Sequence, residues 1–130
     1  MKLKDTIIKA SIKSAIKCNG HKQRHGAVIF KGSHNIISMG YNHPNRYCNK
    51  LNPEYRRWIS SVHAEVDAIL NANIKDCKRS SLLVVRINQK QEFRMSKPCI
   101  HCMNLIKYVG IKRVFYSINT YPFFEEIILY

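Results

Sequence analysis

Apolar residues near the start of the chain recur at three- and four-residue spacing, the period of a helix that buries one side. The stripe consists of Ile8, Ile12, Ala15 and Ile16. Lysines lie beside this stripe, and Asn19-Gly20 follows it, two residues that tolerate the left-handed backbone conformation in which helices often end. We therefore predict an amphipathic helix over residues 5–17 that covers a sheet.

The next apolar segments are short. Residues 26–30 and 35–40 are predicted to form an antiparallel hairpin around the turn Lys31-Gly32-Ser33-His34. The first of these strands is continuously apolar, as expected for a strand buried on both faces. Two more strands are predicted at 81–88 and 113–117. His25 and His34 flank the hairpin, and we interpret both as surface or turn residues.

Two further helices are predicted between the later strands. One begins at Ser60 or Ser61, either of which suits an N-cap, and runs to about residue 73. Its buried stripe is Val62, Val66, Ile69 and Leu70. The other follows Pro98 over residues 99–109 and ends at Gly110.

The remaining segments show no clear period. Residues 41–57 and 88–94 are interpreted as loops, and the tail, 119–130, fits either an edge strand or a packing helix. The order helix, hairpin, helix, strand, helix, strand is typical of an α/β fold with helices on both faces of the sheet. At 130 residues the chain is expected to be a single domain, 1–130.

Candidate chemistry is concentrated at the starts of the two later helices. His63-Ala64-Glu65 lies at one, and Pro98-Cys99-Ile100-His101-Cys102 lies at the other. One imidazole and two thiolates are ligands that Zn²⁺ prefers, and three protein ligands leave a coordination position for water. Cys99 and Cys102 are three residues apart, so both sulfurs lie on one side of a helix. We predict one catalytic zinc ion held by His63, Cys99 and Cys102.

A carboxylate two residues from a metal ligand is placed for proton transfer. Glu65 could take a proton from metal-bound water and return it to a leaving amine. The combination H-x-E followed by P-C-x-x-C is the signature of zinc-dependent nucleobase deaminases. Two other interpretations of the cysteine pair are a thioredoxin-like redox site, which leaves His63 and Glu65 unexplained, and a structural zinc with a fourth ligand such as His101.

Composition narrows the class of protein. Hydrophobic residues make up 45% of the chain, which argues against disorder. The chain contains no run of about 18 apolar residues, so no membrane span is expected. The N-terminus lacks the pattern of a secretory signal, so a cytoplasmic or nuclear location is expected. Five cysteines, two of them in a C-x-x-C pair, fit metal binding better than a disulfide framework.

The formal net charge of +14 favours anionic partners, from a nucleotide phosphate to nucleic acid. The lysines are spread along the chain, so the codon bias of an A+T-rich genome explains them equally well. Aromatic and basic residues of the loop, suited to stacking on bases or to packing, are Tyr47, Tyr55, Arg56, Arg57 and Trp58. His43, Cys48 and Cys77 are candidates for a second zinc site, but no four-ligand spacing completes it.

On these motifs the chain resembles the cytidine and deoxycytidylate deaminase superfamily. The resemblance covers about residues 5–117. It rests on the segments Gly26-Ala27-Val28-Ile29, Gly40-Tyr41-Asn42, His63-Ala64-Glu65, Pro98-Cys99-Ile100-His101-Cys102 and Phe115-Tyr116-Ser117. It implies a three-layer α/β/α cytidine-deaminase-like fold with a central mixed sheet of four to five strands.

The resemblance also implies roles for individual residues. His63, Cys99 and Cys102 would hold zinc, and Glu65 would be the proton shuttle. The backbone of Ala64 would contact the base, Asn42 would bind the base or sugar, and Tyr116 would lie near a loop that selects substrate. Asp67 stands where deoxycytidylate deaminases often carry an asparagine, and an acid there would repel a phosphate.

The expected function is hydrolytic deamination of a cytosine nucleotide or nucleoside, with dCMP to dUMP as the leading reaction. Zinc-bound hydroxide would attack C4 of the base while Glu65 shuttles the proton. The alternative is a polynucleotide deaminase acting on cytosine or adenine in single-stranded DNA or RNA, including tRNA. A third hypothesis is a nucleic-acid-binding module with a structural zinc. The resemblance further implies a homo-oligomer.

Overall fold

A mixed sheet forms the centre of the protein. The computed structural model describes residues 3–17, 24–44 and 61–129. The strands of the main sheet are β1 (Arg24–Lys31), β2 (Asn35–Tyr41), β5 (Ser81–Ile87), β6 (Phe93–Arg94), β7 (Arg113–Ser117) and β8 (Phe124–Ile128). Their order is β2-β1-β5-β7-β8, and β6 also pairs with β5. A separate two-stranded ribbon joins β3 (His43–Pro44) to β4 (Ser61–Val62).

One pair of strands in this sheet is parallel. β5 and β7 run side by side in the same direction, while β1–β2, β1–β5, β5–β6 and β7–β8 are antiparallel. β7 pairs with residues 81–84 of β5, and β6 pairs with residues 86 and 87 of the same strand. The predicted α/β fold is therefore confirmed, with β6 as an additional strand in a segment that we expected to be a loop.

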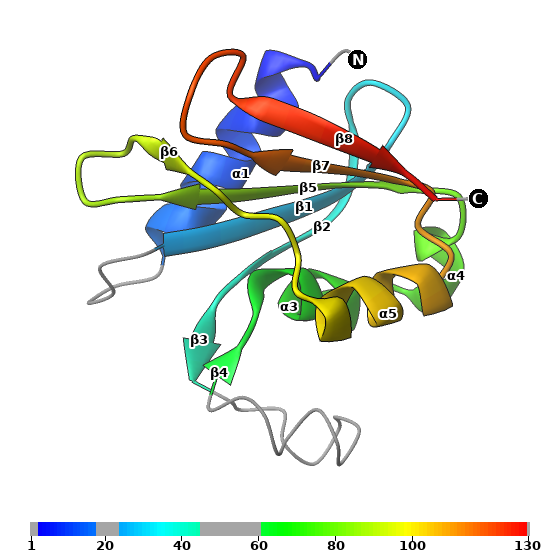
Figure 1. Ribbon diagram of the computed structural model, residues 1–130. Helices are drawn as coiled ribbons and strands as arrows, with labels where there is room; N and C mark the ends of the chain where they lie inside the picture. Colours follow the sequence, from blue (N-terminus) through cyan, green and yellow to red (C-terminus); the bar gives the residue numbers. More distant parts are fainter. Residues whose placement is uncertain (1–2, 18–23, 45–60, 130) are drawn as a thin grey trace.

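Helices cover both faces of the sheet, as predicted (Figure 1). α1 (Asp5–Ile16) lies on one face, and α3 (Ala64–Asn71), α4 (Ile74–Cys77) and α5 (Ile100–Tyr108) lie on the other. Because strand side chains alternate in direction, two cores result. The core under α1 includes Val28, Leu83 and Phe115, and the core under α3 and α5 includes Ala27, Val84 and Val114.

The buried side of α1 differs from the predicted stripe. Its buried residues are Ile7, Ser11, Ser14 and Ala15. Of the predicted stripe, Ala15 is buried, Ile8 and Ile12 are partly buried against the same core, and Ile16 is 39% exposed. The helix lies so close to the sheet that a Cβ on Gly26 would lie 2.6 Å from the amide nitrogen of Ala15. Next to Gly26 the helix residues must be small, so Ser11 and Ala15 occupy that contact, while Ile7 is buried farther along the helix.

Three other predictions about elements need correction or completion. α3 begins at Ala64 and not at Ser60 or Ser61, because Ser61 and Val62 pair with His43 and Pro44 as β4. A short helix, α4, follows α3 and was not predicted. The tail forms the edge strand β8, antiparallel to β7, which resolves the open choice between strand and helix.

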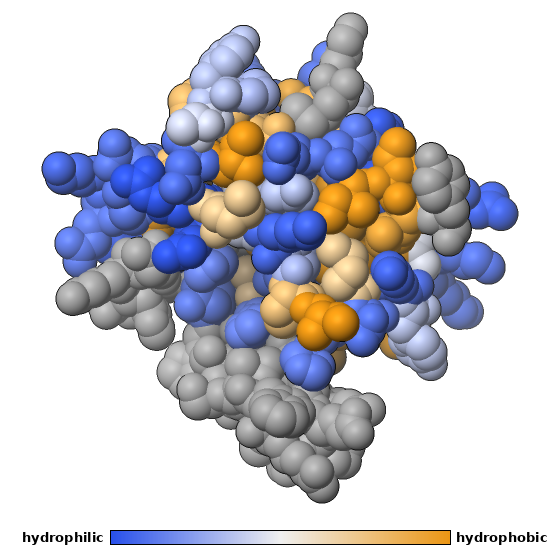
Figure 2. Space-filling model, viewed as in Figure 1, coloured by the Kyte–Doolittle hydropathy of each residue, from blue (hydrophilic) through white to orange (hydrophobic). Residues whose placement is uncertain are grey.

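Hydrophilic residues cover most of the face seen in Figure 2, with small apolar patches between them. None of the described helices has the length and apolar content needed to cross a membrane. The predicted aromatic and basic loop, Tyr47 to Trp58, lies outside the described residues.

Candidate metal centre

The two helix starts that carry the candidate ligands come together in the structure. The donor atoms of His63, Cys99 and Cys102 all lie within 4.8 Å of one another. His63 is the N-cap of α3, and Cys99 is the N-cap of α5. His63 Nδ1 lies 3.2 Å from Cys102 Sγ and 4.0 Å from Cys99 Sγ. In the part of the chain that the structure describes, this is the one cluster of at least three such donors.

This donor set fits a zinc ion. Zn–N and Zn–S bonds of about 2.0 and 2.3 Å in tetrahedral geometry place nitrogen and sulfur about 3.6 Å apart. The two nitrogen–sulfur distances, 3.2 and 4.0 Å, lie on either side of that value. His101, the candidate fourth ligand of a structural zinc, is exposed and is not part of the cluster. Three protein ligands would leave one coordination position of a tetrahedral ion for water.

The position of Cys99 favours its thiolate form. The Cys102 side chain hydrogen-bonds to it, and the backbone N–H groups of His101 and Cys102 point at its sulfur. Together with His63, these groups lower the pKa of Cys99 to about 4 although burial opposes them. A helix start supplies unpaired N–H groups, which explains why a cysteine at the N-cap is a good metal ligand.

Glu65 lies in the first turn of α3 and is 5% exposed. Burial raises the pKa of its carboxyl, and Cys99 raises it further. Hydrogen bonds from its own backbone and from Cys102, together with His63, act in the opposite direction. The hydrogen bond places the carboxyl beside the ligand Cys102. A carboxyl with a raised pKa can hold a proton closer to neutral pH than an exposed glutamate can.

α3 is fixed on the sheet by contacts with β2. A Cβ on Gly40 would lie 2.6 Å from the carbonyl oxygen of Ala64, so only glycine allows this approach. Ser38 Oγ donates a 2.8 Å hydrogen bond to the carbonyl of Ala68. Asp67, 2% exposed, accepts a 3.0 Å hydrogen bond at Oδ2 from the amide of Tyr41. The carboxylate of Asp67 therefore belongs to the packing between α3 and β2.

The segment before α5 is fixed in a similar way. Ser96 Oγ donates to the carbonyl of Val84 at 2.8 Å and accepts from the amide of Ser117 at 2.8 Å. The amide of Ser96 donates to the carbonyl of Ser117 at 3.0 Å. These bonds attach the segment to Val84 within β5 and to Ser117 at the end of β7, the two parallel strands, and so position Cys99. Ligand sites at the carboxyl ends of parallel strands are common in α/β proteins.

The predicted substrate contacts are placed as follows. Asn42 is half-buried after β2, and its Oδ1 accepts a 3.0 Å hydrogen bond from the amide of His25. Ala64 is fully buried at the start of α3. Tyr116 lies on β7, and its hydroxyl donates a 2.9 Å hydrogen bond to Glu125 Oε1 on β8. Burial, followed by the contact with Glu125, raises the pKa of Tyr116. Their roles toward substrate stay predictions.

His25 was interpreted from the sequence as a surface or turn residue, which is wrong. It lies in β1 opposite Arg86 of β5, and it is half-buried. It alternates with Gly26, so it faces the same side as Ala27 and the α3–α5 core. Burial, Arg86 and His63 lower its pKa to about 4. Extending the predicted strand by two residues at its start would have placed His25 on this face.

The candidate second zinc site stays a hypothesis. Cys77 is fully buried in the core under α3 and α5, and burial raises the pKa of its thiol. His43 lies in β3, but nothing is described of its side chain, and Cys48 lies outside the described residues.

Comparison with known proteins relates these features to a family. The model of the cytidine and deoxycytidylate deaminase zinc-binding region matches residues 1–118. The deoxycytidylate deaminase of Mus musculus is 32% identical over 111 residues, and that of Pongo abelii is 29% identical over 110 residues. Each alignment covers 78% of this chain and 56% of the relative. The chain thus spans little more than half the length of these curated relatives.

Solved structures support the same fold. The dCMP deaminase of cyanophage S-TIM5 superposes with a TM-score of 0.55 at 22% identity, covering 92% of this chain and 88% of that one. The cytidine deaminase of Mycobacterium leprae gives a TM-score of 0.56 at 16% identity, covering 94% and 91%. Because the family model matches residues 1–118, most of this chain, the chain belongs to the cytidine and deoxycytidylate deaminase family, a family of zinc-binding hydrolytic deaminases.

Proposed function

We propose that this protein deaminates a cytosine nucleotide or nucleoside hydrolytically, and that dCMP is the substrate, converted to dUMP. The observation that carries the proposal is the convergence of His63, Cys99 and Cys102 beside a buried Glu65. The relatives named deoxycytidylate deaminase support the choice of a deoxynucleotide.

His63, Cys99 and Cys102 would hold the zinc ion. When bound, the metal would lower the pKa of a coordinated water toward about 7, which makes water a usable nucleophile at neutral pH. The Cys102 side chain and the backbone N–H groups of Cys102 and His101 lower the pKa of Cys99, which favours the thiolate form that a metal ion binds.

Glu65 would move the protons. In the overall reaction a water oxygen bonds to C4 of the cytosine ring, and the exocyclic nitrogen leaves as ammonia. Glu65 would accept one proton of the water and deliver it to the ring nitrogen, and would then take the second proton from the new C4 hydroxyl and deliver it to the leaving amine. Its burial and raised pKa suit a group that must both take and return a proton near neutral pH.

Three residues would position the base and sugar. Asn42 is held against β1 by the amide of His25, which fixes the orientation of its amide group. The backbone of Ala64, between the ligand and Glu65, would contact the base. Tyr116, anchored by Glu125, would line the site next to the β7–β8 turn. A single catalytic domain over 1–130 and a homo-oligomeric assembly stay predictions.

A second candidate is deamination of cytosine or adenine in single-stranded DNA or RNA. The net charge of +14 favours it, because a polyanion gains affinity from every phosphate that a cation neutralises. Ionic strength separates the two candidates. Affinity for a polynucleotide falls steeply with salt, whereas turnover of a mononucleotide changes little.

The test is a product assay by mass spectrometry on zinc-loaded protein, with Glu65→Ala as the blank. The panel contains deoxycytidine, dCMP, cytosine, and single-stranded oligonucleotides with cytosine or adenine. We expect a gain of about one mass unit on dCMP, the change from an amine to a carbonyl oxygen. A gain on an oligonucleotide alone would replace the leading proposal with the second. No gain on any substrate, with zinc tightly held, would indicate a structural zinc.

A further inference from the structure

A basic pocket lies at the end of α5 opposite to the candidate metal centre. Its volume is about 570 Å³, and it is lined by Lys78, Arg79, Lys107, Gly110, Ile111, Lys112, Ile128 and Leu129. Cys99 is the N-cap of α5, and Lys107 lies in its last turn. At 1.5 Å per residue, this helix separates the two places by about 13 Å. The pocket is therefore outside the site described above.

Four cations line this pocket without an acidic residue among the lining. Lys78, Arg79, Lys107 and Lys112 are all exposed. Within residues 3–17, 24–44 and 61–129, the ion pairs are Arg94–Glu92 and Arg113–Glu126, so none of the four cations is neutralised by a carboxylate there. Asp76 lies nearby on α4 but does not line the pocket. The pocket thus concentrates positive charge that an anion can neutralise.

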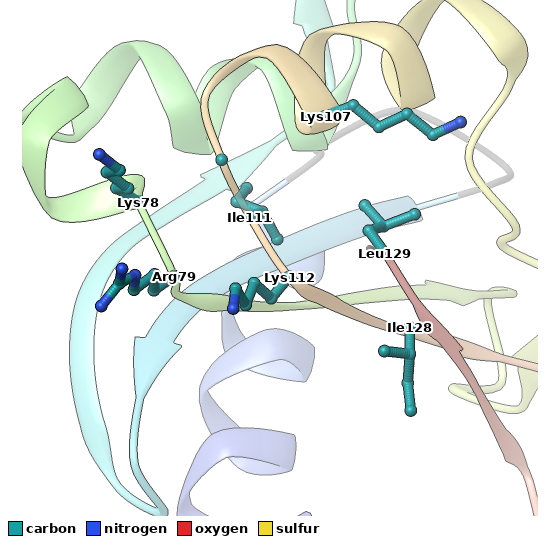
Figure 3. Close-up of a pocket in the computed structure, with 8 residues that line it drawn as sticks. Lys78, Arg79, Lys107, Ile111, Lys112, Ile128 and Leu129 are labelled. Carbon is teal, nitrogen blue, oxygen red and sulfur yellow. The ribbon is translucent and has the colours of Figure 1, made fainter.

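The backbone beneath these cations is held together by hydrogen bonds between two turns. The amide of Arg79 donates to the carbonyl of Gly110 at 2.8 Å, and the amide of Lys112 donates to the carbonyl of Ser80 at 2.9 Å. Arg79 adopts a φ of +64°, which is uncommon for a residue with a side chain. Figure 3 shows Lys78, Arg79 and Lys112 on one side of the pocket, while Lys107 extends away from them.

We propose that this pocket binds the phosphate backbone of a single-stranded nucleic acid, apart from the catalytic site. The concave shape admits a flexible strand more readily than a duplex. Apart from its cations, the lining contains no side chain that could stack on a base or read its edge, because it has no aromatic, amide or hydroxyl group. Recognition would therefore depend on phosphate charge and not on sequence, in keeping with a chain of net charge +14.

The test measures binding of a fluorescently labelled oligothymidylate by anisotropy on the zinc-loaded full chain. This strand contains no cytosine or adenine, so it cannot be a substrate. The pocket variant is Arg79→Ala/Lys112→Ala, and the matched control is Lys9→Ala/Lys13→Ala, which removes two exposed lysines from α1. We expect the pocket variant to weaken binding about tenfold and the control to weaken it less than about twofold. The slope of the logarithm of the association constant against the logarithm of the salt concentration is negative, and its magnitude should decrease by about 1.4 for the pocket variant.

Three results would overturn the proposal. The first is equal weakening in both double variants, which would indicate general attraction to a basic surface. The second is no binding of the oligonucleotide by the unchanged protein at 150 mM salt. The third is displacement of the strand by thymidine triphosphate at equal phosphate concentration, which would assign the pocket to free nucleotides. Deamination of dCMP is measured in parallel, so a failure of the proposed function is seen separately from a failure of this binding.

Discussion

The two faces of the sheet are built in the same way but differ in what they carry. On each face a glycine lets a helix lie directly on a strand: Gly26 under α1, and Gly40 under α3. Serine side chains then bond across each contact, since Ser14 Oγ donates to the carbonyl of Gly40 at 2.6 Å and Ser38 Oγ donates to that of Ala68. Only the α3–α5 face adds a cluster of metal-ligating donors among the described residues.

The difference shows that close packing of a helix on the sheet does not by itself create a metal-binding site in this fold. α1 packs on one face of the sheet, whereas α3 and α5 lie on the other face and begin next to each other (Figure 1). A helix start offers free N–H groups and a cap position, and two starts together form a site. The same packing without this convergence supplies stability alone.

The largest expected effect distinguishes two buried cysteines on the α3–α5 face of the sheet, Cys102 in α5 and Cys77 in α4. Cys102→Ser should abolish zinc binding and reduce turnover below detection, because it removes one of three protein ligands. Cys77→Ser should retain zinc and cost about 1–2 kcal/mol of stability, because it places a hydroxyl in an apolar core. Zinc content by atomic absorption and dCMP turnover check both variants. If Cys77→Ser lost zinc and Cys102→Ser retained it, Cys77 would be the metal ligand and Cys102 the core residue.

The next effect separates metal binding from catalysis within α3. Glu65→Gln should retain zinc and lower kcat about 10³-fold, because glutamine cannot accept or return a proton. The fold should be kept, since the amide nearly matches the carboxyl in size. Single-turnover kinetics with zinc analysis provide the measurement. Unchanged turnover in this variant would support the structural-zinc hypothesis.

A matched pair of glycine substitutions compares the faces directly. Gly26→Ala and Gly40→Ala should each destabilise the protein by about 2–3 kcal/mol, because the new Cβ would overlap helix backbone on its face. Only Gly40→Ala should also lower zinc affinity in the folded protein, since it displaces the helix that starts at His63. Urea unfolding and zinc titration measure the two effects. Equal loss of zinc affinity in both variants would contradict the separation of the faces.

The smallest expected effect concerns pH. The pKa of His25 is lowered to about 4 from an ordinary value of 6.5. Its neutral form therefore contributes stability that is fully present above pH 6.5 and is lost as the pH falls toward 4. The zinc-free protein should lose folding stability between pH 7 and pH 4.5, and His25→Gln should reduce that loss of stability by up to about 2 kcal/mol. His34→Gln, in the exposed turn, is the control, and an identical pH dependence in His25→Gln would refute the prediction.

Much of this protein could be predicted from the sequence because its signals are local. Short apolar runs predicted β1, β2, β5 and β7, and Pro98 with Gly110 bounded α5 closely. The candidate zinc ligands and Glu65 could be proposed from the sequence because metal ligation and proton transfer require particular residue types at short spacing. The structure brings His63, Cys99 and Cys102 together as that hypothesis requires.

Other features depended on contacts between distant segments. The sequence determined the class of the fold and the candidate ligand set, because periodicity and side-chain chemistry act within a few residues. Tertiary structure decided which side of α1 is buried, since the close approach at Gly26 requires small residues such as Ser11 and Ala15 at that point. It also decided the position of His25 beside Arg86 and the basic pocket assembled from α4, α5 and β8. These arrangements follow from strand register and turn packing, which join residues that are far apart in the chain.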